Sequence, residues 1–356
     1  MNQAGRIQQW SQRLNLRLLI LVLALGLGLN LVGVGHLLVA FHWMLSPADL
    51  QLLVQLGSLL VMVLIAAAGI YSLVSEFAFW EGWLQGLPAP ASLFEPAAAG
   101  RAPYRCYLVY LDGIHQLERD HPPRVSNFLA LLEQHLPDDT LLVRGLETYT
   151  VMPVALAEDA GSAWFWRRLF ALQEHYPSPW IQLLAAVLVQ ANNVIKVGIS
   201  SDRRYGPILN YELALKISLR LAEAGFRPDT GSSIVLSGYS GGAEMAMGVA
   251  DYLRRITRSP VSIISFCGVF SGNQVLHQLA GITTIVGSKD PVAAFGRFAY
   301  PGRSPLLPLS NWNKSLAAGR IHRLEIEGMN HNGNQGPFSD AFRWPVVRAI
   351  LASLPP

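Results

Sequence analysis

The sequence predicts an α/β protein in which a mostly parallel sheet flanked by helices is preceded by two transmembrane helices. Beyond about residue 104, short apolar runs typical of buried strands alternate with helical patterns, as in successive β-α-β units. Residues 1–80 carry only five charged side chains and contain two long apolar runs. One later strand-like run ends in Gly238-Tyr239-Ser240-Gly241-Gly242, where a strand turns sharply into a helix.

The composition divides the chain into a part suited to lipid and a globular part. The whole sequence is 51% hydrophobic and 14% charged, with a mean hydropathy of +0.30, which is more apolar than an ordinary soluble protein. The apolar excess lies in residues 1–80. The net charge is +3 and the basic residues are scattered, so the sequence predicts no nucleic-acid partner.

Two apolar runs predict a helical hairpin in the membrane. Leu18–Ala40 is long enough to cross a hydrocarbon core of about 30 Å, and Leu56–Val74 carries no charge. No cleavage site follows the first run, which favours a retained helix over a signal peptide. Spans over about 18–43 and 54–78 are therefore expected, within a hairpin of residues 1–83.

Basic residues predict the orientation of this hairpin. Arg6, Arg13 and Arg17 precede the first span, while the turn at 46–51 has no Lys or Arg. By the positive-inside rule the N-terminus and everything after the second span are cytoplasmic, and the protein is a multi-pass membrane protein with two spans. Polar residues of the first span, such as His36, either pair with the neighbouring helix or serve transport or sensing.

The remaining elements follow from local pattern. Residues 84–103 are rich in proline and alanine and predict an extended linker, so that the folded domain covers 104–356. Apolar runs rich in β-branched residues and leucine predict strands at 104–111, 140–144, 234–239, 261–267, 282–286 and 321–327, the last alternating like a half-exposed edge. Helical periodicity predicts helices at 125–136, 207–224, after the turn at Ser240, and at 345–354, with an apolar, aromatic helical insertion at about 160–200.

The turn at Ser240 predicts a reactive serine. Glycines two residues before and two residues after it allow the strand and the helix to pass closely, which permits a strained backbone at the apex. A serine there stands above the positive end of the following helix. The alternative is an ordinary glycine-rich strand-to-helix turn.

A serine hydroxyl needs a base to take its proton and a third group to orient that base. Two later strands run into loops with suitable residues: Asp290 follows strand 282–286, and His331 follows strand 321–327. The alternatives are a turn or N-cap aspartate at 290 and a surface-loop histidine at 331. Rival acids are Glu325, Glu327 and Asp340.

With the order Ser240, Asp290, His331, the chain resembles the α/β-hydrolase family over about residues 104–356. The resemblance implies an α/β-hydrolase-type fold in which Ser240 is the nucleophile, His331 the general base and later acid, and Asp290 the group that orients the histidine. No spacing of His and Cys indicates a zinc site, and neither metal nor cofactor is expected. Cys106 and Cys267 lie in apolar runs and are predicted to be buried thiols, the alternative being a disulfide or a reactive site.

An acyl-transfer site also needs hydrogen-bond donors for the oxyanion. The backbone N–H of Gly241 is one predicted donor. The resemblance points to the loop after the first strand for the other, with the Ile114 N–H as donor and Gly113 permitting the turn. The family often has His-Gly where this chain has Asp112-Gly113.

Substrate contacts are predicted from residues around the turn and from the insertion, where the family builds a lid: Tyr239, His115, Trp164 and Trp166. His115 is otherwise a plain loop residue, and the insertion aromatics otherwise pack on the sheet. The polar segment 202–207 either binds an anionic head group through its arginines or is a solvated helix start.

These patterns favour a membrane-anchored serine hydrolase that cleaves an ester of a lipid or another apolar acyl substrate, because the hairpin would concentrate the site at the bilayer. The alternative is a catalytically silent, hydrolase-like domain that binds a ligand or partner at the membrane. A histidine at 331 beyond hydrogen-bond reach of Ser240 would favour that alternative.

Overall fold

The structure, a computed structural model, describes the folded domain and small parts of the N-terminal region. The described residues are 51–52, 55–60, 62–63, 94, 104–116, 121–149, 190, 193–202 and 206–355, without the side chain of residue 208. Most of the expected hairpin and linker, the insertion up to residue 189, and segment 203–205 therefore lie outside them. Within the described part of the chain, no helix combines the length and the apolar character needed to cross a membrane.

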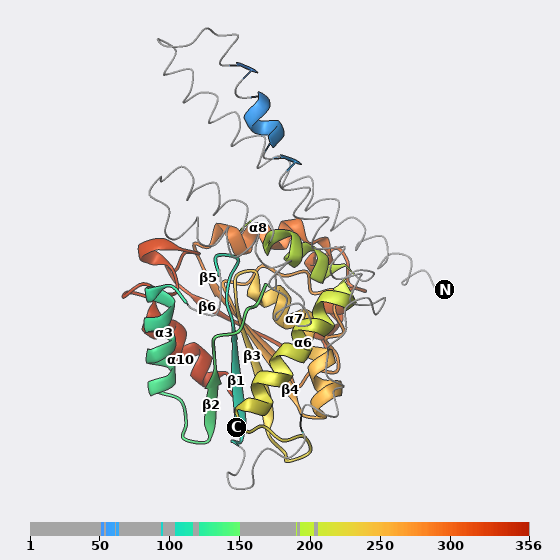
Figure 1. Ribbon diagram of the computed structural model, residues 1–356, viewed down its shortest axis with the longest axis vertical. Helices are drawn as coiled ribbons and strands as arrows, with labels where there is room; N and C mark the ends of the chain where they lie inside the picture. Colours follow the sequence, from blue (N-terminus) through green and yellow to red (C-terminus); the bar gives the residue numbers. More distant parts are fainter. Residues whose placement is uncertain are drawn as a thin grey trace, which may run out of the picture.

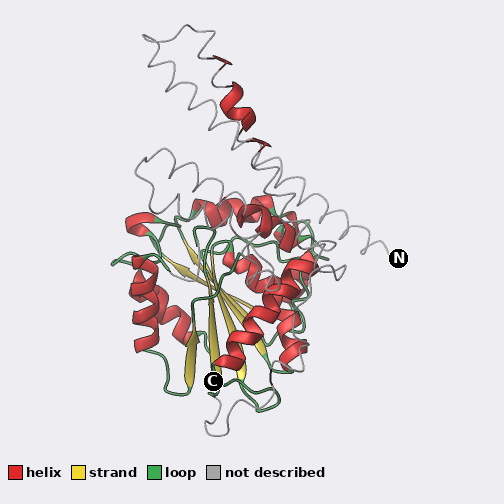
Figure 2. Cartoon of the chain, in the orientation of Figure 1, coloured by secondary structure: helices red, strands yellow, loops and turns green. Residues whose placement is uncertain are grey.

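Six parallel strands form one sheet in the order β2-β1-β3-β4-β5-β6 (Figures 1 and 2). They are β1 (Cys106–Leu111), β2 (Thr140–Val143), β3 (Ser233–Tyr239), β4 (Val261–Phe266), β5 (Gly281–Gly287) and β6 (Ile321–Ile326). This arrangement confirms the predicted α/β class with a parallel sheet. Each predicted strand is present, with ends within two residues of those expected.

Burial explains why these runs are strands. All six residues of β1 are buried, as expected for a strand covered on both faces of a parallel sheet. At the other extreme, β6 pairs only with β5 among the described strands, and most of its residues are exposed. The prediction of an edge strand is confirmed among the described strands, but His322 to Glu325 are all exposed, so the expected alternation of buried and exposed residues is not observed.

The helices lie on both faces of the sheet. Their bounds are α3 (Pro123–Gln134), α6 (Gly206–Glu223), α7 (Gly242–Thr257), α8 (Pro291–Ala299), α9 (Asn311–Ala317) and α10 (Arg343–Ala352), with short 3-10 turns η3 (Pro301–Arg303) and η4 (Gly333–Gln335). Residues 193–201 are also helical. The predicted helices are confirmed to within two residues, whereas no prediction covers α8 or α9.

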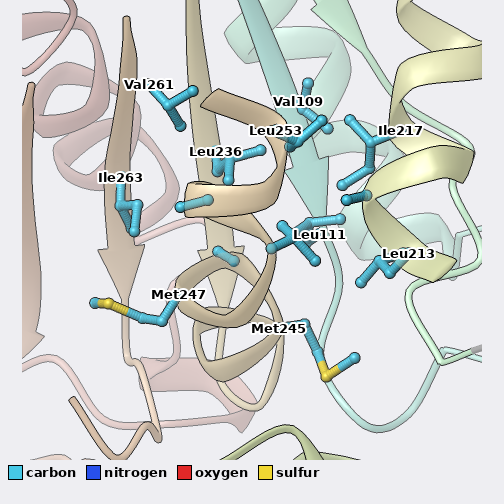
Figure 3. Packing of buried hydrophobic residues seen from close by; sticks show 14 of the residues in the cluster. Val109, Leu111, Leu213, Ile217, Leu236, Met245, Met247, Leu253, Val261 and Ile263 are labelled. Carbon is cyan, nitrogen blue, oxygen red and sulfur yellow. The ribbon is translucent and has the colours of Figure 1, made fainter. Parts of the chain in front are cut away.

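Alternate residues of the strands pack into two separate cores. Tyr107, Val109 and Leu111 of β1 face the core that contains α6 and α7, and Figure 3 shows this packing around α7. Cys106 and Leu108, together with Tyr110, face the core that contains α3 and α10. Because side chains alternate along β1, this strand contributes residues to the cores on both faces of the sheet. It also pairs with β3 along its whole length, so the carboxyl ends of β1 and β3 lie side by side.

Candidate active site

Ser240 follows β3 directly and precedes α7, so it stands at the carboxyl edge of the central strand. Its φ is +51°, in the left-handed region that non-glycine residues rarely adopt. A Cβ on Gly238 would lie 2.6 Å from the Gly242 carbonyl oxygen, and one on Gly242 would lie 2.4 Å from the Leu111 carbonyl oxygen. Both positions therefore require glycine, which agrees with the sharp turn predicted from the sequence.

The serine begins a chain of three hydrogen-bonded side chains. Ser240 Oγ lies 3.0 Å from His331 Nε2, and His331 Nδ1 lies 3.0 Å from both carboxylate oxygens of Asp290. All three residues are buried, with relative exposures of 5–8%. This geometry is the one that lets an imidazole take a proton from a hydroxyl while an acid fixes the orientation of the ring.

Asp290 also caps α8. Its Oδ1 accepts hydrogen bonds from the backbone N–H groups of Val292 and Ala293, at 3.0 and 2.8 Å. Burial acts to raise the pKa of this carboxyl, but the hydrogen bonds from His331 and from the Ala293 N–H outweigh it, and the net pKa is lowered. Asp290 therefore serves as the N-cap of α8 and also contacts the His331 ring, so the two roles weighed from the sequence are combined in one residue.

The rival acids do not reach the histidine. Glu325 is exposed and pairs with Arg323 at 2.9 Å, Asp340 is exposed and pairs with Arg343, and Glu327 is exposed.

Tyr239 holds the loop that carries His331. Its hydroxyl donates to the His331 carbonyl oxygen at 3.0 Å and also contacts Asn332 Oδ1 at 2.5 Å. The tyrosine and histidine rings stack with centroids 5.6 Å apart. Tyr239 is 6% exposed, so the structure places this predicted substrate contact against the loop that carries the base. Burial raises the pKa of its phenol, which keeps the hydroxyl protonated and able to donate.

The loop after β1 lies against the turn at Ser240, where the second oxyanion donor was predicted. A Cβ on Gly113 would lie 3.3 Å from Ser240 Cβ, and one on Gly241 would lie 2.9 Å from Ile114 Cγ2. The Gly113 carbonyl oxygen accepts from the Gln116 N–H at 3.0 Å, which fixes the peptide that carries the Ile114 N–H. The three predicted oxyanion residues are thus brought together beside the serine.

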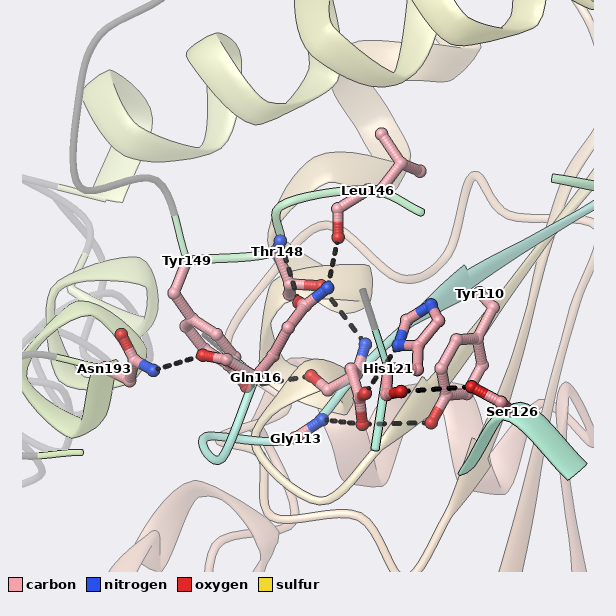
Figure 4. A network of polar contacts seen from close by, with 10 residues as sticks. Tyr110, Gly113, Gln116, His121, Ser126, Leu146, Thr148, Tyr149 and Asn193 are labelled. Carbon is pink, nitrogen blue, oxygen red and sulfur yellow. Dashed lines mark hydrogen bonds and ion pairs between the residues drawn. The ribbon is translucent and has the colours of Figure 1, made fainter. Parts of the chain in front are cut away.

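Asp112 is the residue that holds this loop, and Figure 4 labels its partners Tyr110, Gly113 and His121. It is buried, and its Oδ1 accepts from the Gly113 N–H at 2.7 Å and from the Tyr110 hydroxyl at 3.0 Å. Its other oxygen lies 2.9 Å from Nδ1 of His121, a ring that packs edge-on against Tyr110. The aspartate that replaces the His of the His-Gly pattern is therefore a buried anchor under the loop.

The opposite side of the loop is pinned by groups from two other segments. The Tyr149 hydroxyl donates to the Asp112 carbonyl oxygen at 3.1 Å. The Asn193 side chain donates to the Ile114 carbonyl oxygen at 2.7 Å and to the carbonyl oxygen of Gln116 at 3.2 Å; Figure 4 labels Tyr149, Asn193 and Gln116. The Gln116 amide group donates to the Leu146 carbonyl oxygen at 2.6 Å. A loop fixed at so many points presents its N–H groups in one arrangement, as oxyanion stabilisation requires.

Of the other predicted substrate contacts, one is exposed and two lie outside the described residues. His115 is exposed on the same loop. The pKa of His115 is lowered, chiefly because part of its ring is buried. The charge of Asp112 raises this pKa, and the charge of His331 lowers it further. Trp164 and Trp166 fall outside the described residues, so their roles stay predictions.

Cys267 lies beside Asp290 and His331, but the three residues do not have the properties of a metal site. Ligand atoms of Cys267, Asp290 and His331 lie within 4.8 Å of one another. However, both nitrogens of His331 are already hydrogen-bonded, and burial followed by the charge of Asp290 raises the pKa of the Cys267 thiol well above its ordinary value. A metal would need the thiolate and a free imidazole nitrogen. Cys106 and Cys267 are both free and buried, as predicted.

Glu244 is a buried acid that sequence reasoning missed. It lies in the first turn of α7 and accepts from the Ser271 N–H at 2.5 Å, from the Ser271 hydroxyl at 3.1 Å and from the Gln274 amide. Burial raises the pKa of this carboxyl to about 7, although its hydrogen bonds and the charge of Arg303 lower it. The only sequence feature that pointed to Glu244 as a residue near the site was its position four residues after Ser240.

The fold and the site together define an α/β protein with a serine–histidine–aspartate chain at the carboxyl edge of its sheet. Comparison of the sequence with protein-family models gives no match, and a search of curated proteins gives no match either. The functional argument therefore depends on the geometry of the residues described above.

Proposed function

We propose that this protein is a membrane-anchored serine hydrolase of the α/β-hydrolase type that cleaves an ester with a lipid or other apolar acyl part. The observation that carries the proposal is the continuous contact from Ser240 Oγ through His331 to Asp290, with each step at 3.0 Å. The left-handed backbone of Ser240 and the order of its partners along the chain add support.

The residues can perform acyl transfer in two steps. His331 takes the proton of Ser240 as Oγ bonds to the ester carbonyl carbon, and the imidazolium then gives that proton to the leaving alcohol as the ester bond breaks. His331 next takes a proton from a water molecule as its oxygen bonds to the acyl carbon, and the imidazolium returns that proton to Ser240 Oγ as the Oγ–acyl bond breaks and the acid leaves. Asp290 keeps its negative charge because its pKa is lowered, so it stabilises the imidazolium in both steps.

The oxyanion that forms in each step needs donors beside Ser240. The N–H groups of Gly241 and Ile114 are the proposed pair, supported by the packing of the two residues against each other. Each such donor contributes roughly 3 kcal/mol to lowering the barrier.

The apolar runs before residue 80 support a membrane setting and hence a lipid or other apolar ester. Tethering raises the concentration of the site at the bilayer, where such a substrate resides. A His331 beyond hydrogen-bond reach of Ser240 would favour the silent-domain alternative, and the 3.0 Å contact counts against it.

The test uses the full chain in detergent with a short chromogenic ester and a fluorophosphonate probe. Ser240→Ala should abolish labelling and lower kcat on the order of 10⁵-fold or more. Ser237→Ala is the matched control, because Ser237 is fully buried in β3, the strand that leads to Ser240, and its hydroxyl has no hydrogen-bond partner among the described residues. A folded wild-type protein that is neither labelled nor active would reject the proposal.

A further inference from the structure

Helix α8 buries small residues and exposes large apolar ones, which is the opposite of an ordinary surface helix. The side that packs on the protein is made of Ala293, Gly296 and Ala299, all buried. The opposite side presents Val292, Phe295 and Phe298, which are 38, 42 and 75% exposed. A soluble helix normally buries its large apolar side chains, so this outward face lacks an apolar neighbour among the residues that the structure describes.

The chain after α8 extends the same apolar character. The 3-10 turn η3 packs against both α8 and α9, so these segments are neighbours. The loop between η3 and α9 exposes Leu306 and Leu309, at 88 and 44%. We name Val292, Phe295, Phe298, Leu306 and Leu309 together the α8 surface.

The segment that carries the α8 surface is basic along the sequence, and the next acids, Glu325 and Glu327, lie at the end of β6 and in the loop after it. Between residues 291 and 324 the sequence contains no Asp or Glu, but it contains five basic residues. Arg297 and Lys314 are exposed, whereas the Arg303 guanidinium lies inward, 3.7 Å from the centre of the Phe270 ring. Arg320 directly precedes β6 and therefore lies at the amino edge of the sheet, away from α8. Apolar side chains bordered by basic ones are the composition of a helix that lies in the interface of an anionic bilayer.

The α8 surface also begins at the candidate active site. Asp290, which contacts His331, is the N-cap of α8, and Figure 1 shows α8 beside the carboxyl ends of the strands. A membrane seated on this surface would therefore lie next to Ser240. A second copy of the chain fits less well, because a symmetric contact would bring the same basic residues together.

We propose that the α8 surface docks the folded domain onto a bilayer containing anionic lipid, so that the acyl substrate passes from lipid to Ser240 without crossing water. The inference rests on the proposed function for its substrate, but docking itself is independent of turnover. In the docked state Phe298 and Leu306 lie among the acyl chains, while Arg297 and Lys314 contact lipid phosphates.

Spin labelling of the full chain in vesicles of phosphatidylcholine and phosphatidylglycerol tests the docking. Phe298→Cys gives a label on the surface, and Asp138→Cys gives a control label at the exposed amino edge of the sheet; the two native cysteines are buried. The label at 298 should be more accessible to oxygen than to a water-soluble nickel chelate, and the label at 138 should show the reverse. Equal access to the chelate at both positions overturns the proposal, as does dipolar coupling between labels at 298 on two copies.

An activity measurement separates docking from chemistry. The double variant Phe298→Glu with Leu306→Glu should lower turnover of a vesicle-borne ester roughly tenfold or more and leave turnover of a short soluble ester unchanged. Trp344→Glu, which changes an exposed apolar residue outside the α8 surface, should affect neither. An equal loss on both esters overturns docking. If the wild-type protein cleaves neither ester, the hydrolase proposal fails, and the spin labels still decide the docking.

Discussion

Asp290 joins the proposed catalytic chain to the N-cap of α8 at a single carboxylate. One oxygen caps α8 and both oxygens face His331. Asparagine is also a good N-cap, so Asp290→Asn should retain stability but lower kcat on the order of 10⁴-fold, because the amide favours the wrong histidine tautomer. Asp290→Ala should lose the same activity and, in addition, about 1 kcal/mol of unfolding free energy.

Ester turnover and urea unfolding of the two variants check this division. Equal unfolding free energies for Asn and Ala at position 290 would show that the cap contributes nothing.

The left-handed backbone of Ser240 predicts an unusual order of stability among variants. At φ +51° a Cβ is strained, so Ser240→Gly should be about 1 kcal/mol more stable than Ser240→Ala in urea unfolding, although both lack the nucleophile. At Ser237, inside β3, the order should reverse, since glycine weakens a strand. The same order at both positions would argue against strain at the serine.

Asp112 is predicted to act through the loop it anchors. Asp112→Ala removes the acceptor of the Gly113 N–H and should lower kcat roughly 10²-fold with little change in KM, because oxyanion donors act in the transition state. Asp112→Asn keeps an acceptor oxygen there and should recover most of kcat. Thermal unfolding of both variants provides the folding control, and an inactive but stable Asn variant would contradict the positioning role.

At the scale of elements, Glu244 links α7 to the loop after β4, and the link depends on pH. Its pKa of about 7 in the folded protein lies above the ordinary 4.5, so between these values the folded state holds a proton that the unfolded chain has released. Its favourable contribution is complete below pH 4.5 and is lost as the pH rises to about 7, on the order of 3 kcal/mol in total.

Glu244→Gln should remove that dependence, since the amide never ionises and Gln274 can rotate to keep a hydrogen bond. Urea unfolding at pH 5, 6, 7 and 8 should give a smaller decline for the variant than for the wild type. Parallel declines would assign the pH dependence to other groups.

The strands and the helices beside them were predictable from the sequence, but α8 was not. Buried strands such as β1 and β3 consist of unbroken apolar runs, and this pattern is local. In α8 the periodic positions that face the protein are small, whereas its large residues face outward. A search for helices that bury large apolar residues therefore misses it.

At the scale of the whole molecule, the sequence predicted the three residues of the candidate site but not their supports. Ser240, Asp290 and His331 each follow a recognisable strand, and parallel strands end at one edge. Asp112 and His121 lie nine positions apart in the sequence, and no local pattern predicts their contact. The family resemblance predicted an oxyanion donor in the loop after β1, and the structure shows which contacts hold that loop.

The strand order also constrains how the molecule is made. β1 and β2 leave the ribosome early, but β3, which covers the other edge of β1, follows only after the chain from 112 to 232. At ordinary elongation rates this interval lasts on the order of ten seconds, during which a fully buried strand has one edge unpaired. The nascent domain therefore passes through a stage that is open to aggregation, and we expect chaperones to occupy the exposed edge of β1 until β3 arrives.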